Sequence, residues 1–147
     1  MHNSRIVLDL PFPPSVNHYY MRTKFGMTIG ARGRDFRKEA IYLCNRQVSM
    51  TERFGADKRL FLSVAVFPPD RRKRDIDNIF KCLLDSLTHA GVYVDDSQID
   101  HLECIRKTRQ PDFGRAVVTI EEIEPVGETV DALKKSKKKA SEPEIVT

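Results

Sequence analysis

The sequence has few of the features that mark zinc-binding, secreted or membrane proteins. Only three of its 147 residues are cysteines, Cys44, Cys82 and Cys104, and no two of them form a Cys-x-x-Cys pair. Its four histidines are scattered, without the spacing of a metal site. No stretch approaches the roughly 20 apolar residues of a membrane span, and the first apolar run is too short for a signal peptide. We therefore expect reduced cysteines and a soluble, cytoplasmic protein.

Positively charged residues are in small excess over negatively charged ones. The 25 Lys and Arg residues and 21 Asp and Glu residues leave a formal net charge of +4. Such an excess suits a polyanionic partner, but it is also common in proteins that bind nothing acidic. Net charge alone does not predict binding to nucleic acid.

The composition predicts one domain followed by a tail. A chain of 147 residues that is 40% hydrophobic can bury one core of ordinary size. We assign residues 1–125 to this domain and residues 126–147 to a disordered tail, because the tail is poor in apolar residues and carries the run KKSKKK. A solvated tail and an additional electrostatic contact with DNA are both compatible with this run.

Hydrophobic periodicity predicts four strands and two main helices. The clearest period lies in residues 76–90, where apolar residues recur every three or four positions up to Gly91. Residues 60–67 are almost continuously apolar, which predicts a central strand buried on both faces. The other elements expected are a strand at 6–10, a loop or irregular hairpin at 15–33, a helix at 34–48, and strands at 99–108 and 115–123 that form an antiparallel hairpin.

Four aspartates flank the predicted helix 76–90, two on each side. Asp75 and Asp77 precede or begin it, whereas Asp95 and Asp96 follow the glycine that ends it. Metal-dependent phosphodiester cleavage requires hard oxygen ligands, and few of them, so that water and phosphate complete the octahedron around magnesium. If the chain reverses after the glycine, the second pair can return toward the first.

These aspartates also have a simpler explanation. An aspartate at the start of a helix caps backbone N–H groups, and an Asp pair is common in turns. Two aspartates beside four consecutive basic residues exceed what capping requires. From spacing alone, a metal site and a pair of caps both remain possible for Asp75 and Asp77.

The neighbouring basic residues have two interpretations as well. Lys81 follows Asp77 by four residues, so it could stabilise developing phosphorane charge or form an exposed helical ion pair of about 0.3–0.5 kcal/mol. Four consecutive cations could grip phosphates or belong to a solvated loop that neutralises its neighbours. They are Arg71, Arg72, Lys73 and Arg74.

A second basic and aromatic group lies in the predicted hairpin region. Tyr19, Tyr20, Arg22 and Lys24 occur within six positions. Such residues could contact unpaired or distorted DNA, and buried tyrosines in a hairpin fit the pattern equally well.

Two segments together resemble one family. PPDRRKRDIDNIFKCLLDSLTHAGVYVDDSQI and the opening LPFPPSVNHYY are similar to the RusA family of Holliday-junction resolvases, in the order strand, basic stretch, Asp-x-Asp-Asn, helix, glycine and Asp-Asp. The resemblance spans most of residues 5–123. It implies an α+β fold with a small mixed sheet of about four strands and two main helices, a homodimer, and Mg²⁺ as cofactor, with Mn²⁺ as a substitute.

The resemblance also implies roles for individual residues. Asp75, Asp77 and Asp96 match metal-binding catalytic carboxylates, and Lys81 matches a lysine required for cleavage. The residues expected to contact DNA are Arg71, Arg72, Lys73, Arg74, Asn17 and Asn78.

The sequence thus predicts a magnesium-dependent endonuclease that cuts four-way or branched DNA, acting in recombination and repair. One alternative is a non-catalytic DNA-binding protein in which the aspartates only cap and turn. Another is a metal-dependent nuclease for other branched or single-stranded DNA, because no residue identifies junction geometry directly.

Overall fold

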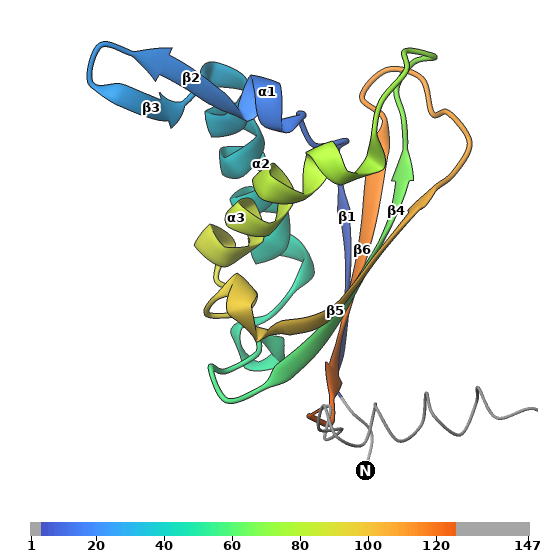
Figure 1. The fold of residues 1–147 in the computed structure, drawn as a ribbon. Coiled ribbons are helices and arrows are strands. Elements are labelled where there is room, and N and C mark those ends of the chain that lie inside the picture. The colour runs from blue at the N-terminus through green and yellow to red at the C-terminus, as the bar shows by residue number, and fades with distance from the viewer. Residues whose placement is uncertain (1–3, 126–147) are drawn as a thin grey trace, which may run out of the picture.

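A four-stranded mixed sheet supports the rest of the fold (Figure 1). The protein is seen in a computed structural model, which describes residues 4–125. The strands lie in the order β1 (Arg5–Leu10), β6 (Arg115–Ile123), β4 (Arg59–Phe67) and β5 (Ile99–Arg106). β6 is antiparallel to both of its neighbours, and β4 and β5 are parallel. The predicted α+β class and four-stranded mixed sheet are confirmed.

The predicted antiparallel hairpin of residues 99–108 and 115–123 is wrong. β4 lies between β5 and β6 and pairs with both. The connection from 107 to 114 passes the end of β4, where the N–H of Lys107 donates to the carbonyl of Val66 at 2.8 Å. A connection of this length crosses the roughly 10 Å that two strand spacings require. Proline and glycine mark a reversal but do not reveal whether a strand is inserted.

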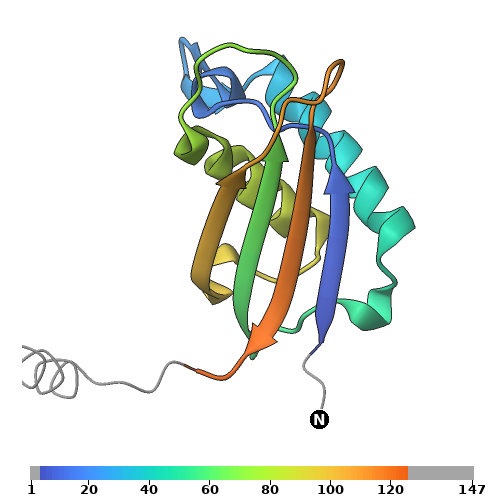
Figure 2. The ribbon, with the colours of Figure 1, turned by 90° about the vertical axis from the view of Figure 1, so that its right-hand side faces the viewer.

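Two main helices cover one face of the sheet, α2 (Ala31–Gln47) and α3 (Phe80–Ala90) (Figure 2). In β4 the buried residues alternate with half-buried ones, so burial on both faces was a wrong prediction for residues 60–67. Phe61 and Ala65 are apolar but lie on the face without helices, which no described element covers. The almost continuous apolar run therefore contains residues with two different surroundings, the core and the open face of the sheet.

α3 confirms the predicted helix with a modified start. Residues Ile76–Ile79 form a 3₁₀ turn, η2, from which α3 continues, and a tighter first turn is common at helix ends. Leu83 and Leu87 are fully buried against the sheet. Gly91 ends the helix with a φ of 74°, which side chains other than glycine rarely adopt.

The predicted irregular hairpin is also present. It consists of α1 (Val16–Tyr19), β2 (Tyr20–Thr23) and β3 (Gly26–Ile29), and β2 and β3 form a separate two-stranded sheet. α1 packs closely on α2 at Gly33, where an added Cβ would lie 2.6 Å from the Tyr19 ring. Glycine is required at this contact, and it fixes the base of the hairpin against α2.

Two sequence predictions concern other parts of the chain. No helix within residues 4–125 is long and apolar enough to cross a membrane. The tail predicted at 126–147 lies outside the described residues.

Candidate active site

The first acidic pair lies where the chain passes from β4 into η2 and α3. Asp75 occupies the N-cap position of η2, and Asp77 lies in its first turn. Both side chains are exposed, and Asp75 forms no side-chain capping bond. The capping explanation therefore fails for Asp75, whose carboxylate stays free for an external partner.

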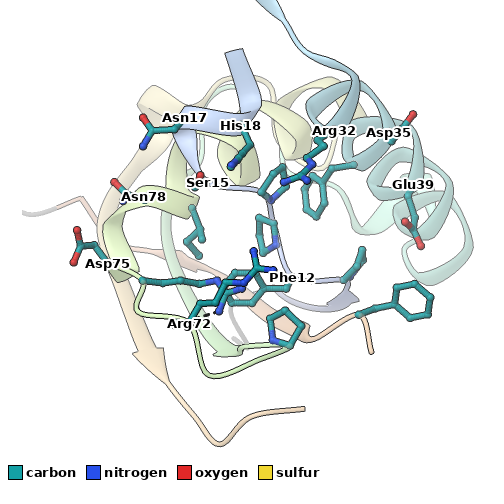
Figure 3. Close-up of a pocket in the computed structure, with 18 of the residues that line it drawn as sticks. Phe12, Ser15, Asn17, His18, Arg32, Asp35, Glu39, Arg72, Asp75 and Asn78 are labelled. Atoms are coloured by element: carbon teal, nitrogen blue, oxygen red, sulfur yellow. Dashed lines mark hydrogen bonds between the residues drawn. The ribbon is translucent and has the colours of Figure 1, made fainter. Parts of the chain in front are cut away.

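A pocket of about 700 Å³ opens beside Asp75 (Figure 3). Asp75, Asn78 and Asn17 lie along one rim, and their side chains point outward. Arg72 crosses the pocket on another side. The structure thus brings together predicted residues from two segments: Asn17, Arg72, Lys73, Arg74, Asp75 and Asn78. α2 adds Arg32, Asp35 and Glu39 to the wall, and sequence reasoning did not connect these residues with the site.

Within the basic run, Arg74 has a structural position. Its guanidinium lies 2.7 Å from a carboxylate oxygen of Asp70 and 5.5 Å from the centre of the Phe12 ring. Hydrogen bonds from Arg74 and from the backbone N–H of Arg72 lower the pKa of Asp70 to about 2. Arg106 of β5 donates to the carbonyl of Arg74. These contacts fix the loop that leads to Asp75.

The other three cations of the run, Arg71, Arg72 and Lys73, are exposed. The side chain of Arg72 is 82% exposed, and its Nε lies 3.7 Å from Asp70. Within residues 4–125, Arg71 and Lys73 form no ion pair. These cations therefore form no ion pairs with Asp75 or Asp77, so the exposed ones can contact phosphates.

Lys81 pairs with a carboxylate other than Asp77. Its ammonium lies 3.4 Å from Asp85, one turn further along α3. The negative charge of Asp85 and its hydrogen bond raise the pKa of Lys81, with smaller contributions from Tyr20 and Asp96. Lys81 is therefore a cation at neutral pH, and it feels the field of Asp96 in the second acidic pair.

Asp85 belongs to a network that sequence reasoning missed. The hydroxyl of Tyr19 donates to Asp85 at 3.3 Å and accepts a hydrogen bond from Arg37 at 2.6 Å. Burial raises the pKa of Tyr19 to about 12. The spacing between Lys81 and Asp85 could have indicated their pairing, but no local pattern indicated contacts with α1 and α2.

The two carboxylates of the second acidic pair have different surroundings: Asp95 is bound by neighbouring groups, and Asp96 is half-buried. Asp95 is the N-cap of η3 (Asp96–Gln98) and accepts hydrogen bonds from the N–H and hydroxyl of Ser97. These bonds lower the pKa of Asp95. The side chain of Gln98 completes the capping box by accepting from the N–H of Asp95 at 2.9 Å. Asp95 is therefore a structural cap, and Asp96 is the candidate ligand.

The predicted carboxylates supply suitable donor atoms for a hard cation, but the structure does not bring three of them together at one point. In the part of the chain that the structure describes, no three His, Cys, Asp or Glu side chains form a group that could hold a metal ion. Asp75 and Asp77 lie on η2, whereas Asp96 lies on η3. The ligand set Asp75, Asp77 and Asp96 stays a prediction.

Comparison with known proteins first gives the class. Residues 11–121 match the family model described as endodeoxyribonuclease RusA. The class is therefore a nuclease, consistent with exposed carboxylates beside exposed cations. Because this match covers most of the chain, the protein belongs to the RusA family, and the predicted family is confirmed.

Individual relatives are similar over almost their full length. The crossover junction endodeoxyribonuclease of Enterobacteria phage HK97 is 40% identical over 117 residues, which cover 80% of this chain and 94% of the relative. The phage 82 enzyme of the same name is 33% identical over 116 residues, covering 79% and 93%. The enzyme from Escherichia coli strain K12 is 31% identical over the same length, with the same coverage.

Proposed function

We propose that the protein is a metal-dependent crossover junction endodeoxyribonuclease, which resolves Holliday junctions by paired nicking of opposed strands. The observation that carries the proposal is the uncapped carboxylate of Asp75 at the rim of a pocket shared with Arg72 and Lys73. Support also comes from the 40% identity to the phage HK97 enzyme over 94% of its length. The function places the protein in DNA recombination and repair.

Asp75, Asp77 and Asp96 are the proposed holders of Mg²⁺, or of Mn²⁺ in its place. Their oxygen atoms are the ligands that these hard cations prefer. A cation bound there supplies a Lewis acid and lowers the pKa of bound water. Asn17 and Asn78 lie beside Asp75 on the same rim, where their amides can position a phosphate backbone.

Lys81 is proposed to stabilise negative charge as the bond to phosphorus breaks. The ordinary pKa of lysine already lies far above neutral pH and that of Lys81 is raised further, so Lys81 serves as a cation and not as a general base. Asp85 holds the ammonium in place from the next turn of α3. The exposed cations Arg71, Arg72 and Lys73 would then hold the strand on either side of the scissile phosphate.

The proposed active unit is a homodimer. A four-way junction has approximate two-fold symmetry, so an isologous dimer presents one site to each of two opposed strands. The sheet face without helices is the surface we assign to this contact (Figure 2). It exposes Val7 by 51% and Ile105 by 49%, and the rings of Phe61 and His101 stack on it at 4.2 Å. Val7→Lys should therefore lower the sedimentation coefficient of the protein.

The direct test is cleavage of a synthetic four-way junction and of linear duplex with the same sequence, in Mg²⁺ or EDTA. Wild type should make paired nicks in the junction only and only with Mg²⁺, and Asp75→Asn should lose them. Tight binding without cutting would favour the non-catalytic alternative. Equal cutting of forks or single strands would favour a broader nuclease, and normal cutting by Asp75→Asn would refute the site.

A further inference from the structure

The β2–β3 hairpin forms an arm that extends from α1 and α2, away from the four-stranded sheet (Figure 1). Its strands pair from Tyr20 with Ile29 to Thr23 with Gly26, and Lys24 and Phe25 form the turn at its tip. Four strand residues span about 13 Å. The tip is therefore held well beyond the body of the protein, where it can enter a partner.

The apolar side chains of this arm are unusually exposed. Phe25 at the tip is 89% exposed, and Met21 and Met27 are 48% and 62% exposed. Met21 pairs with Thr28 and Met27 pairs with Arg22, so the two methionines lie on opposite faces of the arm, and Phe25 lies at its tip. The ring of Phe25 has no packing role in the described fold, so the fold does not account for it.

The charge of the arm indicates the kind of partner. Arg22 is exposed, and the ammonium of Lys24 lies 5.1 Å from the centre of the Phe25 ring. From Tyr20 to Ile29 the sequence contains no Asp or Glu. An arm that is both cationic and aromatic matches a polyanion with open π faces, which nucleic acid presents wherever base stacking is interrupted.

The base of the arm is tied to the candidate active site. The N–H of Gly30 donates to the carbonyl of Tyr19 at 2.8 Å, which closes the arm at its root. The hydroxyl of Tyr19 in turn bonds Asp85, the partner of Lys81. These contacts fix the root of the arm relative to Lys81.

We propose that Phe25 stacks on a base exposed at the branch point of the DNA, and that this contact allows the enzyme to distinguish branched DNA from continuous duplex. The inference rests on the proposed function, which it extends by assigning branch recognition to the arm. In continuous duplex every base is covered by its neighbours, so the ring finds no free face. Only Lys24 and Arg22 then contribute, through phosphate contacts that do not distinguish the two substrates.

The test measures binding in EDTA to a four-way junction and to linear duplex, with wild type, Phe25→Ala and Phe25→Trp. Loss of one stacked base weakens binding by roughly 5- to 150-fold, so Phe25→Ala should lose about tenfold on the junction and little on duplex. Phe25→Trp should retain binding. The fluorescence of 2-aminopurine at the branch point should change on binding wild type and stay unchanged with Phe25→Ala.

Tyr42 supplies a matched control, because its ring on α2 is 59% exposed and has the Arg46 guanidinium 5.7 Å from its centre. Tyr42→Ala should bind both DNAs as wild type does. Unchanged junction binding by Phe25→Ala, an equal loss on duplex, or the same loss in Tyr42→Ala would overturn the role of Phe25 while leaving junction cleavage by wild type intact. If wild type neither binds the junction more tightly than duplex nor cuts it, the proposed function itself is refuted.

Discussion

The two acidic pairs begin two short 3₁₀ helices, yet their carboxylates have different surroundings. At η3, Asp95 is bound by the N–H and hydroxyl of Ser97, and its pKa is lowered as a result. At η2, Asp75 holds the same N-cap position without a capping bond. An aspartate at the same local position thus serves the fold in one case and is free for an external partner in the other. The two roles differ in the hydrogen bonds that the carboxylate accepts. The position of the aspartate in the sequence does not reveal this difference.

The largest loss of cleavage is expected when a free carboxylate at η2 is replaced. We expect Asp77→Asn to lower junction cleavage by roughly 10³-fold, because a lost metal ligand removes several kcal/mol of charge stabilisation. Junction binding should stay equal or become tighter, because the variant removes a negative charge near phosphate. Single-turnover cleavage and a gel-shift assay measure the two effects. Normal cleavage by this variant would show that exposure at η2 does not mark the metal site.

Lys81 lies between the two acidic pairs in the sequence. Its replacement tests what a positive charge contributes to cleavage. Lys81→Ala should lower the cleavage rate by about 10²-fold, as expected when one preorganised positive group is removed from a developing charge. The melting temperature should hardly change, since its ion pair with Asp85 is exposed. The rate is measured over a range of protein concentrations up to saturation. A rate loss that disappears at higher protein concentration would assign Lys81 to binding alone.

The bound carboxylate should behave in the opposite way. Asp95→Ala removes the acceptor of the η3 capping box and should lower the melting temperature, while the cleavage rate below that temperature stays within about twofold of wild type. Thermal unfolding and cleavage at 25 °C separate the two readouts. A loss of cleavage as large as that of Asp77→Asn would place Asp95 in the site and end the distinction.

The smallest effect is expected for Asp70, a bound carboxylate beside the free pair. Its pKa of about 2 in the folded protein lies below the ordinary value of 3.8, so its contribution to stability is complete above pH 4 and is lost as the pH falls through about 2. Urea unfolding should therefore show wild type slightly more stable than Asp70→Asn at pH 6, with the difference vanishing near pH 2. A constant difference across this range would contradict the ion pair with Arg74.

Local patterns predicted the start of the candidate site well. The 3.6-residue period placed Asp75 and Asp77 at the start of a helix, because helical geometry depends only on neighbours in the sequence. The contribution of α2 to the pocket was not predicted, since Asp35 and Glu39 reach it through packing alone. The network of Tyr19, Arg37 and Asp85 was missed for the same reason.

The sheet shows the same limit. Strand periodicity located residues 60–67 and 115–123, but alternation of apolar residues does not encode which strand lies beside which. Only the pairing of β4 with both β5 and β6 decides that residues 99–106 are separated from the next strand. The family resemblance contributed what the pattern lacked, namely an α+β fold and a set of candidate site residues.

The position of β6 has a consequence for the newly made chain. Among the strands of residues 4–125, β1 pairs only with β6, and Arg115 in β6 donates to Asp9 across 106 positions of sequence. During translation, the first strand must therefore wait until almost the whole domain has left the ribosome. Contacts of such long range also slow folding, because the chain loses much entropy before they form. The order of synthesis thus delays assembly of the nuclease until its last strand exists.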